Sequence, residues 1–172
     1  MTDKYALVFD ADRCFGCHAC EVACQQEHDL AQDQKWIRIS QIGPKQVGER
    51  MQMRYVPRIC AHCHVPLCRK ACPAAAISRD DHGVVRIDER KCTGCLDCTW
   101  ACPYGAIHFD REKNLAGKCD LCSSRLTRGL LPSCVHHCPA KAILLTEGGE
   151  AKELEAGRRV ISGGLVRIVY SP

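Results

Sequence analysis

The sequence has few aromatic residues and no long apolar run. Aromatic side chains account for 5% of its 172 residues, with only 2 Trp, 4 Tyr and 3 Phe. Such a chain has little material for an ordinary hydrophobic core. No segment reaches the roughly 18 consecutive apolar residues that a membrane-spanning helix needs, and the longest apolar runs, such as residues 165–170, are short and include a charge. We therefore expect no direct membrane insertion.

The N-terminus also lacks the features of an export signal. Residues 1–10 contain no basic segment followed by an apolar stretch, and no pair of consecutive arginines precedes Cys14. These absences favour a cytoplasmic location, where thiols stay reduced. They argue against a disulfide framework and in favour of bound metal in a cysteine-rich chain.

Cysteine, in contrast, is abundant, with 16 residues. They form four groups of four; each group opens with a C-x-x-C pair, and three of the groups end in Cys-Pro. The groups are Cys14, Cys17, Cys20 and Cys24; Cys60, Cys63, Cys68 and Cys72; Cys92, Cys95, Cys98 and Cys102; and Cys119, Cys122, Cys134 and Cys138. The third group matches the bacterial run C-x₂-C-x₂-C-x₃-C-P that binds iron–sulfur clusters. The total equals the thiolate requirement of four [4Fe–4S] clusters.

The spacing within each group suits a cubane cluster. A C-x-x-C pair brings its sulfurs to one side of a tight loop, so that three cysteines can bind three corners while backbone N–H groups point inward. In two-cluster ferredoxins the fourth cysteine of such a run ligates the other cluster. Each pair of motifs therefore predicts two clusters with exchanged ligands. The motifs could pair as neighbours or in a nested order, and the spacing leaves both open.

Short strands and turns are expected around the cysteine loops, which gives an α+β fold class. After each Cys-Pro, small residues allow close packing and an isoleucine follows to cover the cluster. The core should include Trp36 and Trp100. The expected elements are strands at 5–9 and 84–88, a helix from the first motif continuing to residue 30, a hairpin at about 36–56 turning near 43–44 and 48, a helical piece at 150–158 and a last strand at 165–170.

The formal net charge of +4 argues for bound anions inside the protein. An oxidised cubane core of about +2 with four thiolates carries about −2, so four clusters would add about −8 and leave the loaded chain near −4. The excess of basic residues then compensates the clusters, which argues against nucleic acid as a partner. Arg13, Lys91 and Lys118 each directly precede the first cysteine of a group. They are surface charges, part of a docking face, or groups that raise a cluster's reduction potential.

Zinc is the main alternative to iron, because paired C-x-x-C knuckles also form four-cysteine zinc sites in scaffold modules. Zinc knuckles require neither a third cysteine two residues after the pair nor Cys-Pro after the fourth. Histidines also interleave with the cysteines, at His62, His64, His136 and His137. Since cysteine already fills every cluster corner, we expect these histidines to pack or hydrogen-bond near the loops rather than ligate.

The ordered set of motifs resembles a known family. The matching segments are 55–63 through Cys72-Pro73, then 102–106, then 118–122 with Arg125, Leu126 and Gly129. They resemble the four-cluster ferredoxin-like electron-transfer subunits of molybdenum and tungsten bis-pterin oxidoreductases of the dimethyl-sulfoxide-reductase type. Related small subunits serve tungsten aldehyde oxidoreductases, hydrogenases and carbon monoxide dehydrogenases. The resemblance covers roughly residues 3–145.

The resemblance implies a nested pairing of motifs, first with fourth and second with third. It divides the chain into an outer ferredoxin-like module (1–30 and 110–172) and an inserted one (31–109), related by a pseudo-twofold axis. The implied cluster ligands are Cys14, Cys17, Cys20 and Cys138; Cys24, Cys119, Cys122 and Cys134; Cys60, Cys63, Cys68 and Cys102; and Cys72, Cys92, Cys95 and Cys98.

The function implied by the resemblance is electron transfer through four [4Fe–4S] clusters, without catalysis by the chain itself. The partner would be a large Mo/W-pterin catalytic subunit in a hetero-oligomer, with a further flavin/NAD- or quinone-linked redox subunit as an additional candidate. The short chain, without long insertions between motifs, favours a system such as a tungsten aldehyde oxidoreductase. The alternatives are the electron-transfer subunit of a hydrogenase, formate dehydrogenase or carbon monoxide dehydrogenase and, more remotely, a zinc-binding scaffold.

Overall fold

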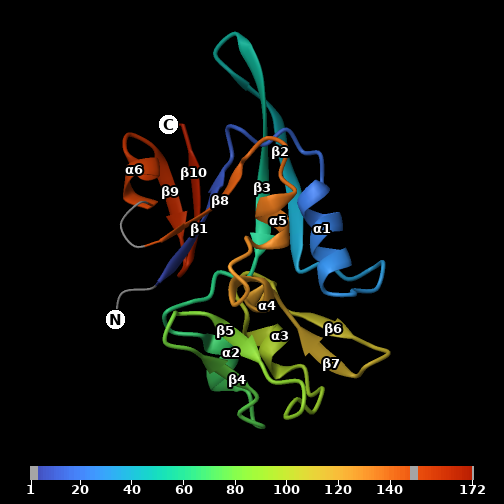
Figure 1. The fold of residues 1–172 in the computed structure, drawn as a ribbon. Helices are drawn as coiled ribbons and strands as arrows, with labels where there is room; N and C mark the ends of the chain where they lie inside the picture. The colour runs from blue at the N-terminus through green and yellow to red at the C-terminus, as the bar shows by residue number, and fades with distance from the viewer. Residues whose placement is uncertain (1–3, 148–150, 172) are drawn as a thin grey trace.

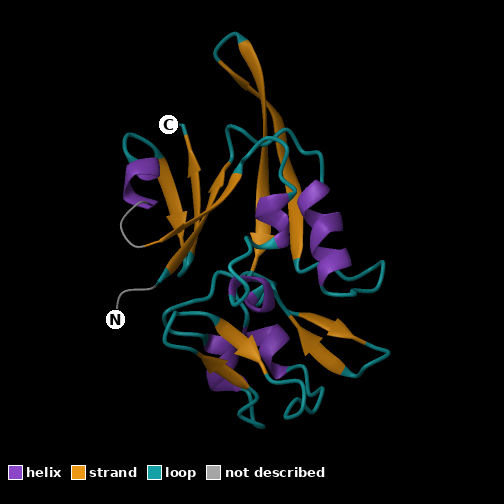
Figure 2. Cartoon of the chain, viewed as in Figure 1, coloured by secondary structure: helices purple, strands orange, loops and turns teal. Residues whose placement is uncertain are grey.

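The computed structural model describes residues 4–147 and 151–171 as a mixture of short strands and short helices (Figures 1 and 2). The α+β class expected from the sequence is therefore confirmed. Among these residues, every helix is too short or too polar to cross a bilayer.

A four-stranded sheet joins the two ends of the chain. Its central strand β1 (Tyr5–Asp10) pairs antiparallel with β8 (Ile143–Glu147) and parallel with β10 (Val166–Tyr170). The edge strand β9 (Arg159–Ser162) pairs with β10. Strand β1 reads as a continuous apolar run because both of its faces are covered. Leu7 and Phe9 pack in the main core among cysteines, whereas Val8 packs with Ala151 of α6 (Ala151–Glu155).

The hairpin expected at about 36–56 is longer than the sequence suggested. Strands β2 (Ile37–Val47) and β3 (Arg50–Ile59) pair antiparallel and turn at residues 48–49, and their outer half extends away from the other elements (Figure 1). The sequence also predicted a turn near residues 43–44, and this prediction is wrong. Gly43 and Pro44 lie inside β2, at a register irregularity between Ile42 and Lys45. A two-stranded ribbon tolerates proline there because the outer edges of its strands need no backbone donor.

Helix α1 (Ala19–Glu27) begins at the first cysteine motif but ends before residue 30. The expected continuation is wrong because Asp29 adopts a left-handed conformation with φ of 47°, which an α-helix does not accommodate. The helical piece expected at 150–158 is present only as α6, which ends at Glu155, while residues 156–158 form a turn; Glu150 lies outside the described residues. No pattern in the sequence indicated β9, because its residues are all exposed and therefore do not alternate.

The middle of the chain consists of very short elements. Helices α2 (Leu67–Ala71) and α3 (Asp97–Ala101) pack against each other, below the larger sheet in Figure 1. The accompanying hairpins are β4 (Ile77–Arg79) with β5 (Val85–Ile87), and β6 (His108–Asp110) with β7 (Leu115–Gly117). Helices α4 (Ser123–Leu126) and α5 (Ser133–His136) follow, and α5 packs against α1.

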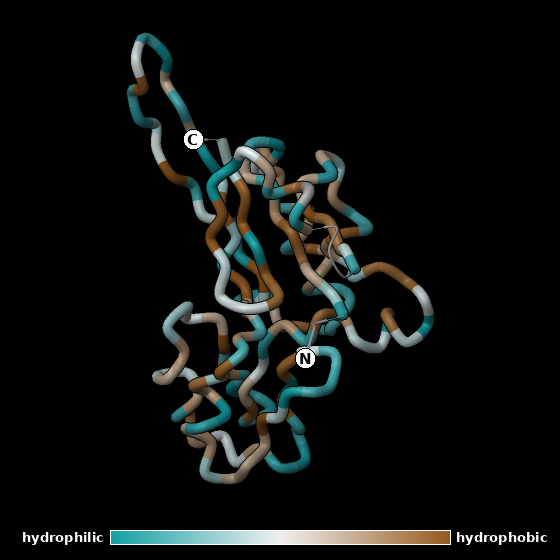
Figure 3. The backbone as a smooth tube through the Cα atoms, turned by 90° about the vertical axis from the view of Figure 1, so that its left-hand side faces the viewer, coloured by the Kyte–Doolittle hydropathy of each residue, from teal (hydrophilic) through white to brown (hydrophobic). Residues whose placement is uncertain are grey.

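The hydropathy of the chain follows this arrangement, with apolar stretches along the sheet and polar residues over much of the hairpin arm (Figure 3). Trp36 is partly buried against the main core, but Trp100 is 87% exposed on α3, so its expected place in the core is wrong. Much of both cores is cysteine, which replaces the large apolar residues that the composition lacks.

An ion pair fastens the C-terminal segment to the first strand. The Arg158 guanidinium donates to both carboxylate oxygens of Asp10 and to Asp12, whose Oδ2 also accepts from the backbone N–H and hydroxyl of Ser171. Asp10 is only 8% exposed. The hydrogen bond from Arg158 is the largest cause that lowers the pKa of Asp10 below its usual value.

Replacing Asp10 with asparagine should lower the free energy of unfolding at neutral pH by roughly 1.5–3 kcal/mol, the range for hydrogen bonds to charged groups. The folded-state pKa lies below the unfolded value of about 3.9, so the stabilisation is complete above that pH and is lost as the pH falls through the lowered value. Urea unfolding followed by circular dichroism should show a constant gap from pH 8 to pH 5 that narrows below about pH 4. Asp81→Asn, at an exposed turn residue, is the control and should change little; an equal loss there would contradict the assignment.

Candidate metal centres

Four cavities in the structure are each lined by four cysteine side chains. We call them cavities I to IV and define each by its four cysteines. Cavity I has Cys14, Cys17, Cys20 and Cys138; cavity II has Cys24, Cys119, Cys122 and Cys134; cavity III has Cys60, Cys63, Cys68 and Cys102; cavity IV has Cys72, Cys92, Cys95 and Cys98. The four cavities are similar in size: each has an empty volume of about 310–340 Å³, including the part that is open to solvent. Each set of four implied by the resemblance thus lies around one cavity.

Two pairs of helices distribute the cysteines between cavities. Cysteines four residues apart lie on the same side of a helix but one turn apart along it, so one helix can serve two cavities. Helix α1 supplies Cys20 to cavity I and Cys24 to cavity II, while the partner α5 supplies Cys134 to cavity II and Cys138 follows it into cavity I.

The pair α2 and α3 repeats this exchange in the middle of the chain. Cys68 and Cys72, in and just after α2, line cavities III and IV. Cys98 and Cys102, in and just after α3, line cavities IV and III. The last cysteine of each motif therefore lies with cysteines of the partner motif.

All four loops share one backbone feature. The second residue after the first cysteine of each motif has a positive φ; these residues are Gly16, His62, Gly94 and Leu121. A left-handed residue in such a loop turns successive N–H groups inward and forms an anion-binding concavity. The backbone N–H groups of His62 and Leu121 each lie 3.4 Å from the sulfur of the first cysteine, as donors. Gly16 is required for a second reason, since a Cβ there would lie 2.4 Å from the Tyr55 ring.

The segment after each Cys-Pro also repeats. The third residue after the cysteine has a positive φ, and the N–H of the fourth donates to the cysteine sulfur. These bonds run from Ala76 to Cys72 at 3.3 Å, from Ala106 to Cys102 at 3.4 Å and from Ala142 to Cys138 at 3.2 Å. The donating residue is alanine in all three segments, and the backbone there folds back onto its own sulfur. Cys24 has no such segment because α1 continues past it.

Apolar side chains surround the sulfurs. The isoleucine after each Cys-Pro segment is buried and lines a cavity: Ile77 in cavity IV, Ile107 in cavity III and Ile143 in cavity I. Burial raises the pKa of Cys20 to about 12 and that of Cys68, Cys98 and Cys122 to about 11. These sulfurs therefore become thiolates only with a bound cation, and metal loading must release protons.

The four histidines between the cysteines differ in their surroundings. His62 is fully buried, and its Nδ1 accepts a hydrogen bond from the Val85 N–H at 3.0 Å. His137 is exposed and its Nδ1 lies 2.9 Å from the Ser133 carbonyl oxygen. His64 and His136 are also exposed. None of the four is among the residues that line cavities I to IV in the described structure.

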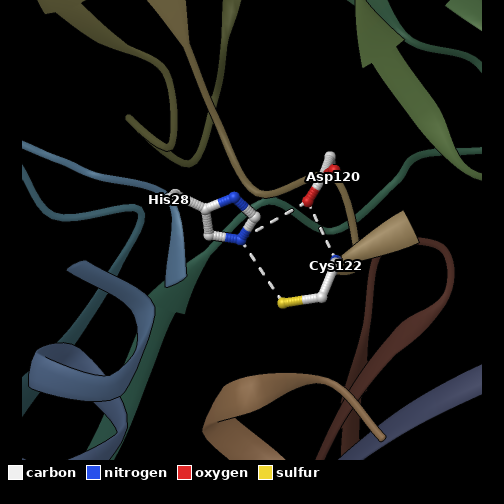
Figure 4. A group of neighbouring side chains, drawn as sticks. All are labelled: His28, Asp120 and Cys122. Atoms are coloured by element: carbon white, nitrogen blue, oxygen red, sulfur yellow. Dashed lines mark hydrogen bonds and ion pairs between the residues drawn. The ribbon is translucent and has the colours of Figure 1, made fainter. Parts of the chain in front are cut away.

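Sequence reasoning missed His28, which caps the C-terminal end of α1 (Figure 4). Its Nε2 lies 3.3 Å from the Cys122 sulfur and 3.6 Å from Asp120 Oδ1, and its ring packs on Trp36 at a centroid distance of 4.5 Å. The three polar groups could hold an ion, as their ligand atoms lie within 4.8 Å of one another. However, Cys122 also lines cavity II, so His28 is better placed as an N–H donor to that sulfur. Only its spacing of four residues from Cys24 could have indicated it.

Glu21 is a second residue that the sequence did not single out. Its carboxylate is 2% exposed and accepts hydrogen bonds from the Lys35 ammonium, the Ile39 N–H and, at 2.9 Å, His18. Burial raises its pKa, but these bonds outweigh burial and leave the pKa below the usual value. The carboxylate therefore fixes α1, with its two cysteines, to the base of the β2–β3 hairpin.

Comparisons with known proteins agree with this architecture. Residues 51–148 match the 4Fe-4S dicluster domain. A probable anaerobic dimethyl sulfoxide reductase subunit, YnfG of Escherichia coli (strain K12), is 37% identical over 161 residues, which cover 90% of this chain and 77% of the relative. A subunit of the anaerobic dimethyl sulfoxide reductase of the same organism is 36% identical over 150 residues, with coverage of 83% and 73%.

A third relative is described by its role. The thiosulfate reductase electron transfer subunit PhsB of Salmonella typhi is 33% identical over 145 residues, which cover 83% of this chain and 76% of that subunit. The cysteine framework, the matched domain and these relatives agree. The protein therefore belongs to the 4Fe-4S dicluster family of iron–sulfur electron-transfer subunits found in reductases of the dimethyl-sulfoxide-reductase type.

Proposed function

We propose that the chain carries single electrons along four [4Fe–4S] clusters, one in each of cavities I to IV, with the four cysteines of each cavity as ligands. Each cluster would supply a one-electron couple. The observation that carries the proposal is the grouping of all 16 cysteines into four similar cavities, each with four sulfurs and inward N–H donors. The donor set fits iron, since thiolates with hydrogen bonds to sulfur are the usual cluster environment.

The four sites would form a row in the order I, II, III, IV. Helix α1 places adjacent sites I and II one turn apart through Cys20 and Cys24. Sites II and III adjoin through Cys119 and Cys60. Burial is the largest cause that raises the pKa of Cys119, and the second largest is the nearby Cys60 thiol. Sites III and IV share α2 and α3. The polypeptide would set the spacing, exclude water with its isoleucines and stabilise the anionic clusters with backbone N–H groups.

The arrangement supports two nested modules, an outer one from 1–30 and 110–172 and an inserted one from 31–109, related by a pseudo-twofold axis. The support is the exchange of cysteines within the pairs α1–α5 and α2–α3. In packing, the base of the β2–β3 hairpin belongs with the outer module, because Ile37, Ile39 and Ile59 are in the main core with Leu7 and Phe9.

The partner would be a molybdenum-pterin catalytic subunit in a hetero-oligomer, with a further redox subunit at the other end of the row. The relatives named as subunits of dimethyl sulfoxide and thiosulfate reductases favour this partner over a tungsten aldehyde oxidoreductase. The chain itself would neither bind nor transform the reductase's substrate.

Anaerobic purification with metal analysis tests the proposal. We expect about 16 iron and about 16 sulfide per chain, a broad visible absorbance that dithionite bleaches, and a co-purifying large subunit that contains molybdenum. About four zinc atoms in place of iron would refute cluster binding. If the chain contained clusters but co-purified with a nickel protein, cluster binding would stand and the molybdenum partner would be refuted.

A further inference from the structure

Of the three basic residues that directly precede a motif's first cysteine, only Lys118 is buried. Arg13 and Lys91 are exposed, whereas Lys118 is 3% exposed at the end of β7. Surface charge, one of the roles expected from the sequence, is therefore excluded for Lys118. The local sequence is the same in kind at Lys91 and Lys118, so the difference comes from the tertiary packing.

The ammonium of Lys118 joins the two halves of the proposed row. It donates to the Val85 carbonyl in β5 and, at 2.8 Å, to the carbonyl of Cys119, a cysteine of cavity II. The side chain also lines cavity III together with that cavity's four cysteines.

Among the side chains that the structure describes (residues 4–147, 151–152 and 154–171), no carboxylate forms an ion pair with Lys118. A buried ammonium without an opposite charge is costly, because desolvation removes the hydration that stabilised it. Two of its three N–H donors have carbonyl acceptors, which leaves one donor for the cavity that it lines. An anionic occupant of cavity III would supply both the missing charge and the missing acceptor.

The neighbouring His62 does not share this role. Its Nδ1 accepts from Val85, the residue whose carbonyl binds Lys118. Because Nδ1 accepts this bond it carries no proton, so the ring is a neutral imidazole. Lys118, which lines cavity III, thus brings a formal positive charge to this junction between cavities II and III.

We infer that Lys118 is the fixed counter-charge of the cluster in cavity III and raises its reduction potential, with a weaker effect on the cluster in cavity II. The inference rests on the proposed function, since it requires those clusters. One-electron reduction takes a cluster from about −2 to about −3, and a nearby positive charge favours the more negative form. Lys118 would act as a positioning and tuning residue that holds electrons at the middle of the row.

Potentiometric titration of the loaded complex, followed by electron paramagnetic resonance, tests the inference. Lys118→Met should shift the midpoint potential of one cluster clearly to lower values and a second one slightly, while Lys118→Arg should keep both near wild type. Lys91→Met is the matched control, an exposed lysine also preceding a first cysteine, and should leave all four midpoints unchanged. Unchanged midpoints in fully loaded Lys118→Met, or an equal shift in Lys118→Arg, would overturn the inference.

Lys118→Gln covers the case in which methionine prevents loading, because its amide can still donate to the carbonyls without a charge. It should show the same downward shift. If both neutral variants lose iron while Lys118→Arg stays loaded, the requirement for charge is supported. If all three variants lose iron equally, the residue is needed only for packing and the counter-charge role is wrong. Wild-type chain without clusters would instead refute the proposed function.

Discussion

Removal of Cys14 and Cys138 together should affect one cluster, whereas removal of Cys134 and Cys138 together should affect two. The first pair comes from motifs more than a hundred residues apart in the sequence but lines cavity I. The second pair comes from one motif but is divided between cavities II and I. Two substitutions in the same cavity affect a single cluster, because the first already removes one of its four thiolates. The number of affected clusters therefore equals the number of cavities changed, whichever motifs supply the cysteines.

Iron analysis and electron paramagnetic resonance of Cys→Ala variants measure this difference. Cys14→Ala/Cys138→Ala should retain about 12 iron atoms per chain, and Cys134→Ala/Cys138→Ala about eight, against about 16 in wild type. A three-iron form in place of a lost cluster would be seen in the resonance spectrum and counts as affected. The equivalent comparison in the middle of the chain is Cys63 with Cys102 against Cys98 with Cys102. Two affected clusters in Cys14→Ala/Cys138→Ala would rule out the nested arrangement.

The cysteine loops were predictable because their chemistry is local. A C-x-x-C pair and a Cys-Pro restrict the backbone within a few residues, and the structure shows the same positive φ at Gly16, His62, Gly94 and Leu121. The grouping of cysteines from distant motifs was not derivable from spacing, which left two pairings open. It came from the resemblance, and in the structure it depends on how α1 packs against α5 and α2 against α3.

Where a residue's role depends on tertiary packing, the sequence could not decide that role. Lys91 and Lys118 occupy the same place before a motif, but only the second is buried, where its ammonium donates to the Val85 carbonyl in the β4–β5 hairpin. His28 approaches Cys122 because α1 ends at Glu27, a boundary that the sequence placed later. Trp100 was expected in the core as an aromatic residue, yet it lies outside on α3.

Removal of iron should unfold the middle of the chain, residues 60–117, before the four-stranded sheet. Helices α2 and α3 have five residues each, far fewer than the roughly 12–15 that an isolated helix needs in water. The strands of β4–β5 and β6–β7 have three residues each, and isolated hairpins are marginally stable at best. The core that joins these elements consists of Ile77, Val85, Ile107 and Ala116 with cysteines, so emptied cavities III and IV would leave little buried apolar surface.

Hydrogen exchange before and after anaerobic treatment with an oxidant and an iron chelator measures this order. Amides of β4 to β7 should lose nearly all protection. Strands β1 and β10 each pair with a strand on both sides and contain buried residues, so their amides should keep a measurable part of their protection. Chain treated with oxidant alone controls for damage to other residues. Retained protection across residues 60–117 in iron-free chain would mean that the polypeptide forms this region without clusters. In that case the cysteines would line cavities already shaped by the chain, and the clusters would add redox chemistry without stabilising the fold.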